Sequence, residues 1–148
     1  MEIDYAFFAE TAAVPPDRKF YCLGGGLFHI GLPQIPGRAT FCIVAGFRFG
    51  PEDADRAHHI ELRFVDGEGK LVIQPVEMNF TSGPPPPGEE LDICLPAVTY
   101  ISPMFGEAGR YRAEYWSDGE LLARVRLRVQ EQQQQAQQQP VPAAPAPG

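Results

Sequence analysis

Hydrophobic and polar residues alternate most regularly in the stretch RYRAEYWSDGELLARVRLRV, residues 110–129. The apolar positions on its two arms are Tyr111, Ala113 and Tyr115, and then Val125, Leu127 and Val129. Apolar residues at every second position are typical of a strand that buries one face and leaves the other in water. Asp118-Gly119 lies between the arms and suits a short hairpin turn. The stretch therefore predicts an antiparallel hairpin.

A second hairpin is predicted over residues 58–80. On its first arm, three apolar residues alternate with Glu61 and Arg63. The sequence DGEG at 66–69 follows and offers glycines that tolerate the positive φ of a tight turn. The second arm, 71–80, returns with further β-branched and aromatic residues.

Three more runs rich in β-branched and aromatic residues occupy residues 3–13, 20–32 and 40–49. Clusters of Gly, Pro or Asp separate the runs, and no window shows the roughly 3.6-residue apolar period of a helix. The prolines at 84–87 also oppose a long helix. We expect about eight short strands, which favours an all-β fold, an antiparallel β-sandwich with an immunoglobulin-like or related Greek-key topology.

Three consecutive glycines, Gly24, Gly25 and Gly26, interrupt the run at 20–32. A Walker loop needs Lys followed by Ser or Thr, and the chain contains no such pair. A dinucleotide fingerprint opens a helix, whereas the sequence after Gly26 has the character of a strand. We therefore predict a structural role: the glycines let the chain bend or change sheets, with a positive φ or a bulge at one or more of them.

The composition changes at Glu131, where the sequence becomes EQQQQAQQQPVPAAPAPG. This segment holds one charge and no aromatic residue, so it cannot bury enough apolar surface to offset the entropy lost on ordering. The expected organisation is one β-sandwich domain over residues 1–130 and a disordered tail or linker stub over 131–148.

Several features indicate a cytoplasmic protein. No apolar run approaches the roughly 18 residues that a membrane span needs, and acidic residues stand where a signal peptide carries basic ones. Cys22, Cys42 and Cys94 are odd in number and widely spaced, as expected for small apolar side chains in a reducing compartment. We expect no contact with a membrane.

The chain shows no assembled chemistry. A net charge of −7 makes nucleic acid an improbable partner. No serine lies in a nucleophile elbow, and Cys22 and His29, the one cysteine and histidine near each other in sequence, lie about 20 Å apart along an extended strand. No catalytic residue and no cofactor are therefore predicted. His59 and Glu61 share one strand face, but without a third ligand they do not define a metal site, and His58 points the other way.

Two groups of residues are candidates for binding a partner. The first lies on the terminal hairpin: Trp116, Arg124 and Arg126, with Arg128 on the same strand face and Arg110 and Arg112 expected across the hairpin. One interpretation is a solvated face balanced by acids such as Glu114; the other is a binding face, because Arg and Trp are enriched at interfaces.

The second group is Tyr100, Met104 and Phe105, which lie near an expected loop. If these side chains are exposed they form a partner site, and if they turn inward they close one end of the sandwich. The sequence leaves both arrangements open.

The order of landmarks along residues 1–130 resembles a family of small uncharacterised bacterial proteins known only as a domain of unknown function. The landmarks are Asp4-Tyr5-Ala6, Ala9-Glu10, Leu23 to Gly26, His59, Glu61 to Arg63, Asp66 to Lys70, Gly109 to Tyr111, and Asp118 to Glu120. The resemblance implies a cytosolic β-sandwich and transfers no activity and no catalytic residue. Separately, the terminal hairpin looks like the last strands of immunoglobulin-like or fibronectin-like domains, where a tyrosine such as Tyr111 sits at a sheet corner.

These observations favour a non-enzymatic interaction module that binds a protein partner or itself. Binding to itself would form a homodimer. The alternative is a small-ligand carrier or a cryptic hydrolase with a pocket at one end of the sandwich.

Overall fold

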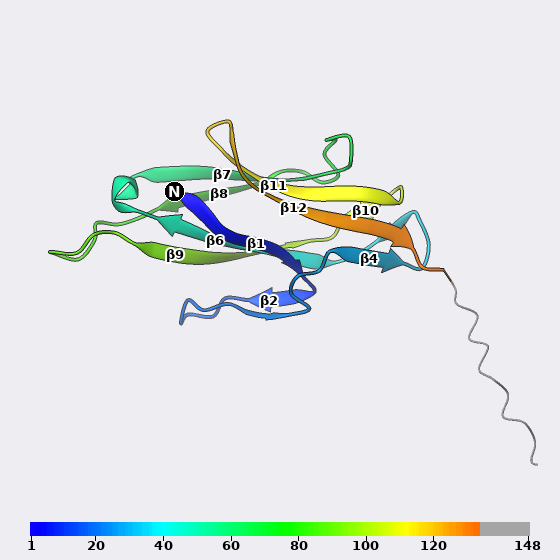
Figure 1. The fold of residues 1–148 in the computed structure, drawn as a ribbon, viewed down its shortest axis with the longest axis horizontal. Coiled ribbons are helices and arrows are strands. Elements are labelled where there is room, and N and C mark those ends of the chain that lie inside the picture. Colours follow the sequence, from blue (N-terminus) through cyan, green and yellow to red (C-terminus); the bar gives the residue numbers. More distant parts are fainter. Residues whose placement is uncertain (134–148) are drawn as a thin grey trace, which may run out of the picture.

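The structure is a computed structural model that describes residues 1–133. These residues form twelve strands and one short 3-10 helix, η1 (Figure 1). In chain order they are β1 (Glu2–Ala9), β2 (Thr11–Ala13), β3 (Tyr21–Leu23), β4 (His29–Leu32), β5 (Gly37–Arg38), β6 (Phe41–Phe49), η1 (Pro51–Asp53), β7 (Ala57–Val65), β8 (Val76–Thr81), β9 (Ile93–Ile101), β10 (Met104–Phe105), β11 (Gly109–Ser117) and β12 (Glu120–Glu131). Eight strands have four residues or more, which agrees with the predicted number.

The strands form two main sheets that face each other, with orders β1-β6-β9 and β4-β12-β11-β7-β8. β2 pairs with β3, and β5 pairs with β10, as two small additions. If β1, β6, β7, β8, β9, β11 and β12 are named A, B, C, C′, E, F and G, the sheets are A-B-E and G-F-C-C′, an immunoglobulin-like arrangement. The predicted all-β sandwich is confirmed.

One strand pair departs from the antiparallel arrangement expected throughout: β4 runs parallel to β12, with His29 beside Arg128 and Leu32 beside Glu131. Two antiparallel neighbours can be joined by a short turn, but a parallel pair requires a long connection. Here most of the domain lies between the two strands, so no local pattern in the sequence signals their contact.

The three glycines lie where the chain moves from one sheet to another. β3 ends at Leu23 beside β2, Leu27 then forms an isolated bridge with Phe8 of β1, and the chain enters the five-stranded sheet as β4. Gly24 and Gly26 have φ of 62° and 78°, a region that residues with a Cβ atom rarely adopt. The prediction that the glycines redirect the chain through positive φ is confirmed.

β6 is buried on both faces. Its inward side chains, Phe41, Ile43, Ala45, Phe47 and Phe49, lie in the core between the two sheets. Its outward side chains pack in a second cluster beneath the β2-β3 pair, where Tyr5, Phe7 and Phe20 cover Cys42 and Val44. This third layer explains why the sequence of β6 is almost continuously apolar rather than alternating.

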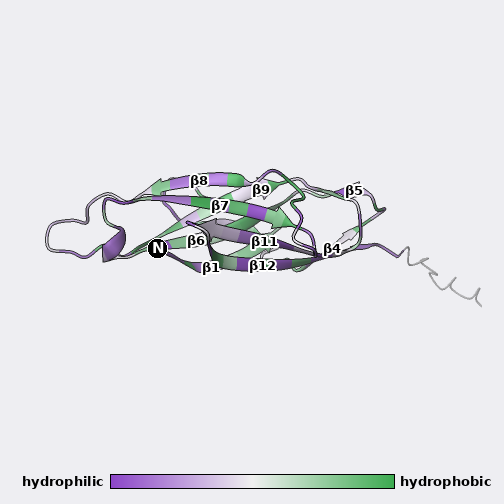
Figure 2. Cartoon of the chain, turned by 90° about the horizontal axis from the view of Figure 1, so that it is seen from above, coloured by the Kyte–Doolittle hydropathy of each residue, from purple (hydrophilic) through white to green (hydrophobic). Residues whose placement is uncertain are grey.

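Aromatic rings join the two sheets at the centre of the domain. Phe8 and Phe41 from one sheet contact Phe64 from the other, with ring centroids 6.2 and 6.0 Å away, and Phe105 closes this group at one end. Edge-on and offset ring pairs of this kind add to the stability that burial provides. Along β7 and β8, hydrophilic and hydrophobic bands alternate, as a half-buried strand requires (Figure 2).

Both predicted hairpins are present. β11 and β12 pair around Asp118 and Gly119, whose φ values of 48° and 79° fit a type I′ turn. β7 and β8 form the second hairpin, although its return strand begins only at Val76. The expected tail, 131–148, begins within the last strand at Glu131. Most of that tail, residues 134–148, lies outside the described residues.

Candidate functional site

The outward side of β11 and β12 carries a group of basic residues that we call the arginine face: Arg110, Arg112, Arg124, Arg126 and Arg128. Pairing of the two strands puts Arg110 opposite Arg128 and Arg112 opposite Arg126, as the sequence predicted. The arrangement follows from the alternation, because the intervening apolar residues are held in the core. Like charges directly opposite each other destabilise a sheet unless anions separate them.

Glu114 separates part of the arginine face. It is only 5% exposed, and its carboxylate accepts hydrogen bonds from Arg112 Nε at 2.5 Å, Arg124 Nε at 3.2 Å and Trp116 Nε1 at 3.0 Å. Burial acts to raise the pKa of the Glu114 carboxyl, but the hydrogen bonds from Arg112 and Trp116 and the nearby arginine charges outweigh it and lower the pKa. Glu114 therefore stays ionised and holds Arg112 and Arg124.

Trp116 is also engaged within the protein. Its indole N–H donates to Glu114, and the Arg63 guanidinium lies 5.0 Å from the ring centroid, a cation–π contact. Arg63 in turn pairs with Glu61 at 2.5 Å. Of the predicted partner-binding residues on the hairpin, Trp116 and Arg124 thus belong to an internal network centred on Glu114.

Arg110, Arg126 and Arg128 make no ion pair with any carboxylate in residues 1–133. All three are exposed. They line a shallow hollow of about 860 Å³, together with the ring of Phe28, which is 76% exposed. The surface therefore combines unpaired cations with an open aromatic ring.

The other predicted partner-binding residues do not form one surface. Tyr100 lies on the opposite sheet, where its hydroxyl donates to the carbonyl oxygen of Ala12 at 2.7 Å and accepts from the Ala12 amide at 2.8 Å. Met104 is exposed, but Phe105 is completely buried. Of the two arrangements that the sequence left open, Phe105 follows the inward one, while Tyr100 fastens β2 to β9.

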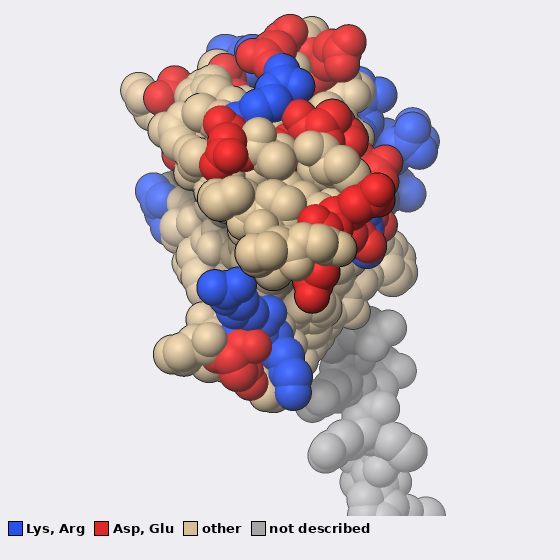
Figure 3. All heavy atoms as spheres, turned by 90° about the vertical axis from the view of Figure 1, so that its left-hand side faces the viewer, with Lys and Arg blue, Asp and Glu red and all other residues tan. Residues whose placement is uncertain are grey.

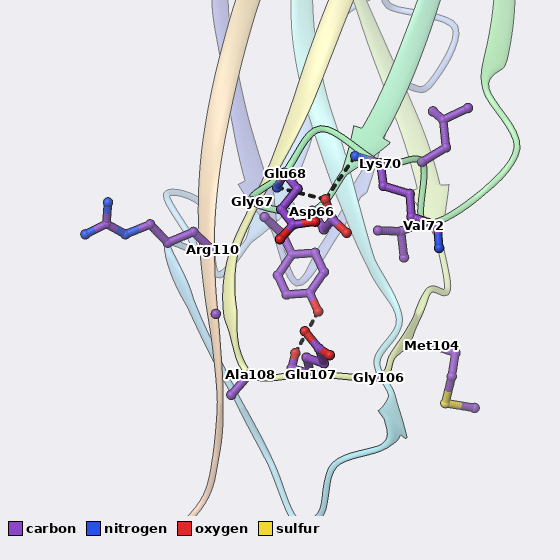
Figure 4. Close-up of a pocket in the computed structure, with 13 residues that line it drawn as sticks. Asp66, Gly67, Glu68, Lys70, Val72, Met104, Gly106, Glu107, Ala108 and Arg110 are labelled. Atoms are coloured by element: carbon purple, nitrogen blue, oxygen red, sulfur yellow. Dashed lines mark hydrogen bonds between the residues drawn. The ribbon is translucent and has the colours of Figure 1, made fainter.

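A second hollow, of about 570 Å³, lies at one end of the sandwich between the turn after β7 and the loop before β11. Tyr111 lines this hollow, and its hydroxyl donates a 2.6 Å hydrogen bond to the carbonyl oxygen of Glu107. Asp66 accepts from the amides of Glu68 and Lys70, both at 2.9 Å. Arg110 also lines the hollow, but its side chain points away from the other labelled residues (Figure 4).

The side chains around this end hollow do not form a nucleophile and base pair. No Ser, Cys or His is among the described residues that line it, and the Tyr111 hydroxyl and the Asp66 carboxylate already have backbone partners.

The histidines occupy separate environments. His59 Nδ1 lies 3.0 Å from Asn79 Oδ1, while His58 turns inward, with its Nε2 at 3.0 Å from Asp53 Oδ1. Glu61 is held by Arg63. Across residues 1–133, no three His, Cys, Asp or Glu side chains gather as a metal site requires.

Sequence reasoning did not identify Phe28 as a surface residue. Alternation with Ile30 places Phe28 on the inward side, but β4 begins only at His29, so the alternation does not extend to it. Arg110 and Arg128 were recognisable from their spacing, whereas the capture of Arg124 by Glu114 could not be assigned before the geometry was known.

Within the described part of the chain, no helix is long and apolar enough to cross a membrane.

Comparison with known proteins identifies the family of this chain. A search of curated proteins finds no match. Residues 4–130 match the Family of unknown function (DUF6941), which covers almost the entire described domain and agrees with the resemblance seen in the sequence. The chain therefore belongs to this family, a domain of unknown function with a β-sandwich fold.

Proposed function

We propose that this protein is a non-enzymatic interaction module of the bacterial cytoplasm that docks a protein partner on the arginine face. One observation carries the proposal: Arg110, Arg126 and Arg128 lie side by side without an acidic partner in residues 1–133, although the chain has a net charge of −7. The three free thiols of the described domain are in keeping with a reducing compartment.

The arrangement of the arginines supports an external acidic ligand. Like charges that lie opposite each other destabilise the isolated protein. Carboxylates supplied by a partner turn this repulsion into a favourable electrostatic interaction. Guanidinium groups suit this role because they bind carboxylates in a bidentate manner and are weakly hydrated. The neighbouring Phe28 ring adds apolar area that is gained only when a partner covers it.

A protein segment fits this surface better than nucleic acid does. Three unpaired arginines are few for a nucleic-acid interface, which depends on many phosphate contacts. The net negative charge repels a polyanion over long distances, whereas a short acidic segment feels mainly the local arginines.

Site-specific photo-crosslinking in living cells tests the proposal. A photoreactive amino acid at Arg126 is expected to capture a protein through an acidic segment. The same residue placed at Arg18, an exposed position on a different surface, serves as the control. Equal capture at both positions, or capture of nucleic acid at Arg126, would contradict the proposal.

The end hollow supports a second candidate function, the carriage of a small polar molecule. Its volume of about 570 Å³ is adequate for such a ligand, and Glu68, Lys70 and Glu107 surround it. A thermal-shift screen against a metabolite library tests this function, with an Ala108→Trp variant that fills the hollow as the control. Stabilisation that persists in Ala108→Trp would place the ligand elsewhere.

A further inference from the structure

We propose that the arginine face docks the segment GPPPPGEE, residues 83–90, of a second copy of this chain. We call this segment the proline loop. The proposal rests on the proposed function, since it identifies the partner of the same surface. The proline loop connects β8 to β9 and begins after Ser82, which is buried and hydrogen-bonds to the carbonyl oxygen of Asp53.

The proline loop carries acids without a partner of their own. Glu89 and Glu90 are exposed and make no ion pair with a described residue, in contrast to Asp92, which pairs with Arg48 at 2.6 Å. The Glu89 amide donates to the Pro86 carbonyl oxygen at 3.0 Å, so a turn follows the prolines directly and presents the two acids. Leu91, only 6% exposed, anchors the loop to the core.

The two surfaces match in chemistry. The proline loop offers two carboxylates, and the arginine face offers three guanidinium groups, none of which has an ion-pair partner within residues 1–133. Directly opposed residues in an antiparallel pair have Cα atoms about 4.5–5.5 Å apart, and consecutive residues such as Glu89 and Glu90 have theirs about 3.8 Å apart. Each carboxylate can therefore reach its own arginine.

The prolines match the exposed aromatic ring in the same way. Proline-rich segments adopt an extended conformation that loses little entropy on binding, and they dock against aromatic side chains. Pro84 to Pro87 precede the acids, and Phe28 lies beside the arginines that would receive those acids. A single docking contact therefore places the proline rings against the Phe28 ring and the loop carboxylates against the arginine guanidinium groups.

The two surfaces cannot meet within one molecule. The proline loop projects from one end of the sandwich, while β4, which directly follows Phe28, lies toward the other end (Figures 1 and 2). Figure 3 looks onto the end from which the loop projects and shows acidic side chains on both sides of an uncharged centre. Complementary surfaces at opposite ends of a rigid domain can pair only between copies.

Sedimentation measurements across a wide concentration range test the proposal with charge reversals. We compare the wild type with R126E/R128E and with E89K/E90K, all of them exposed positions. We expect the wild type to self-associate, more weakly at high salt, and each double variant to weaken association about tenfold or more. The control R18E/K19E changes the net charge by the same amount as R126E/R128E and is expected to associate like the wild type.

An equimolar mixture of the two double variants provides the decisive arm. In the mixture, the lysines on the loop of one variant face the glutamates that replace Arg126 and Arg128 in the other. We expect the mixed species to associate more strongly than either variant alone, which also shows that both variants are folded. A Phe28→Ala variant is expected to weaken wild-type association without changing its dependence on salt.

Two results would overturn the inference. The first is a wild type that stays monomeric at every concentration. The second is association that R126E/R128E abolishes while E89K/E90K leaves it unchanged. This second result would retain the arginine face as a docking surface for some other acidic segment, so failure of the self-docking is distinguishable from failure of the proposed function. If a photoreactive amino acid at Arg126 captures no protein, both the self-docking and the proposed function are contradicted.

Discussion

The Tyr111 hydroxyl donates a 2.6 Å hydrogen bond to the carbonyl oxygen of Glu107, four residues earlier in the chain. The Tyr111 ring lies edge-on to Phe105, with 4.8 Å between centroids, and stacks with Phe64. Tyr111 therefore fixes the loop that enters β11 and closes one end of the core. Immunoglobulin-like domains carry a tyrosine corner at the start of the equivalent strand.

Replacement of Tyr111 by Phe removes this hydrogen bond and keeps the packing of the ring. We expect the free energy of unfolding to fall by about 1 kcal/mol, the usual net contribution of one hydrogen bond. Urea unfolding measures the change. The control is Tyr21→Phe, since the Tyr21 hydroxyl donates to the carboxylate of the exposed Asp17, at 3.1 Å. A similar loss in both variants would show that the corner contributes nothing particular.

Glu114 makes the stability of the fold depend on pH. Its pKa in the folded protein is below the ordinary value of 4.5, so its charge stabilises the fold above that pH. This contribution is lost as the pH falls below about 4.5 and the carboxylate is protonated in the folded state. Near neutral pH, Glu114→Gln is expected to lower the free energy of unfolding by about 1–3 kcal/mol, because Arg112 and Arg124 lose a charged hydrogen-bond acceptor.

Chemical unfolding measured at a series of acidic pH values checks this expectation. The stability of Glu114→Gln should fall less steeply with acid than that of the wild type, so the two curves converge at low pH. Glu120→Gln, at an exposed position of the hairpin turn, should follow the wild type. Parallel curves for Glu114→Gln and the wild type would contradict the role assigned to the carboxylate.

Gly26 offers a clean test of backbone conformation. It has φ of 78°, and no atom beyond Gly26 and its two chain neighbours lies within 4 Å of the position that a Cβ would occupy, so space does not limit substitution there. We expect Gly26→Val to cost about 1–2 kcal/mol through the left-handed conformation alone. Gly26→Asn should cost less, since Asn tolerates this region better.

Thermal and urea unfolding measure these costs, and the crosslinking yield at Arg126 measures binding by the same variants. Gly26→Val is expected to reduce stability and to leave the yield per folded molecule unchanged. A stable Gly26→Val with reduced binding would assign the glycines a functional rather than a conformational role.

Tyr100 fastens the small β2-β3 pair to the three-stranded sheet. Its hydroxyl bonds to both the amide and the carbonyl of Ala12, and lies 2.8 Å from Thr11 Oγ1. In Tyr100→Phe the Ala12 amide loses its partner, so hydrogen exchange should accelerate over residues 11–13 and 21–23. Exchange in β11 should not change, and an unaltered exchange rate at Ala12 would contradict the clamp.

The terminal hairpin shows what local sequence determines. Strict alternation assigned the faces of β11 and β12, and Asp118-Gly119 supplied the turn, because both signals depend on residues adjacent in the chain. The positive φ at Gly24 and Gly26 was predictable for the same reason, as only glycine adopts that region at little cost.

Contacts between distant segments were decided by the tertiary structure. The parallel pairing of β4 with β12 and the cover that Tyr5 and Phe20 provide over β6 join residues far apart in sequence. Such contacts form only when the whole domain closes and buries its apolar surface, so they leave no periodic signal in the chain.

The same distinction applies to the arginine face. The sequence by itself determined that five arginines share one side of a hairpin, since the strand period is local. The tertiary structure decided which of them form ion pairs within the described domain: Glu114 holds Arg112 and Arg124, while Arg110, Arg126 and Arg128 remain exposed beside Phe28. Partner choice depends on distances across strands, and those distances exist only in the assembled sheet.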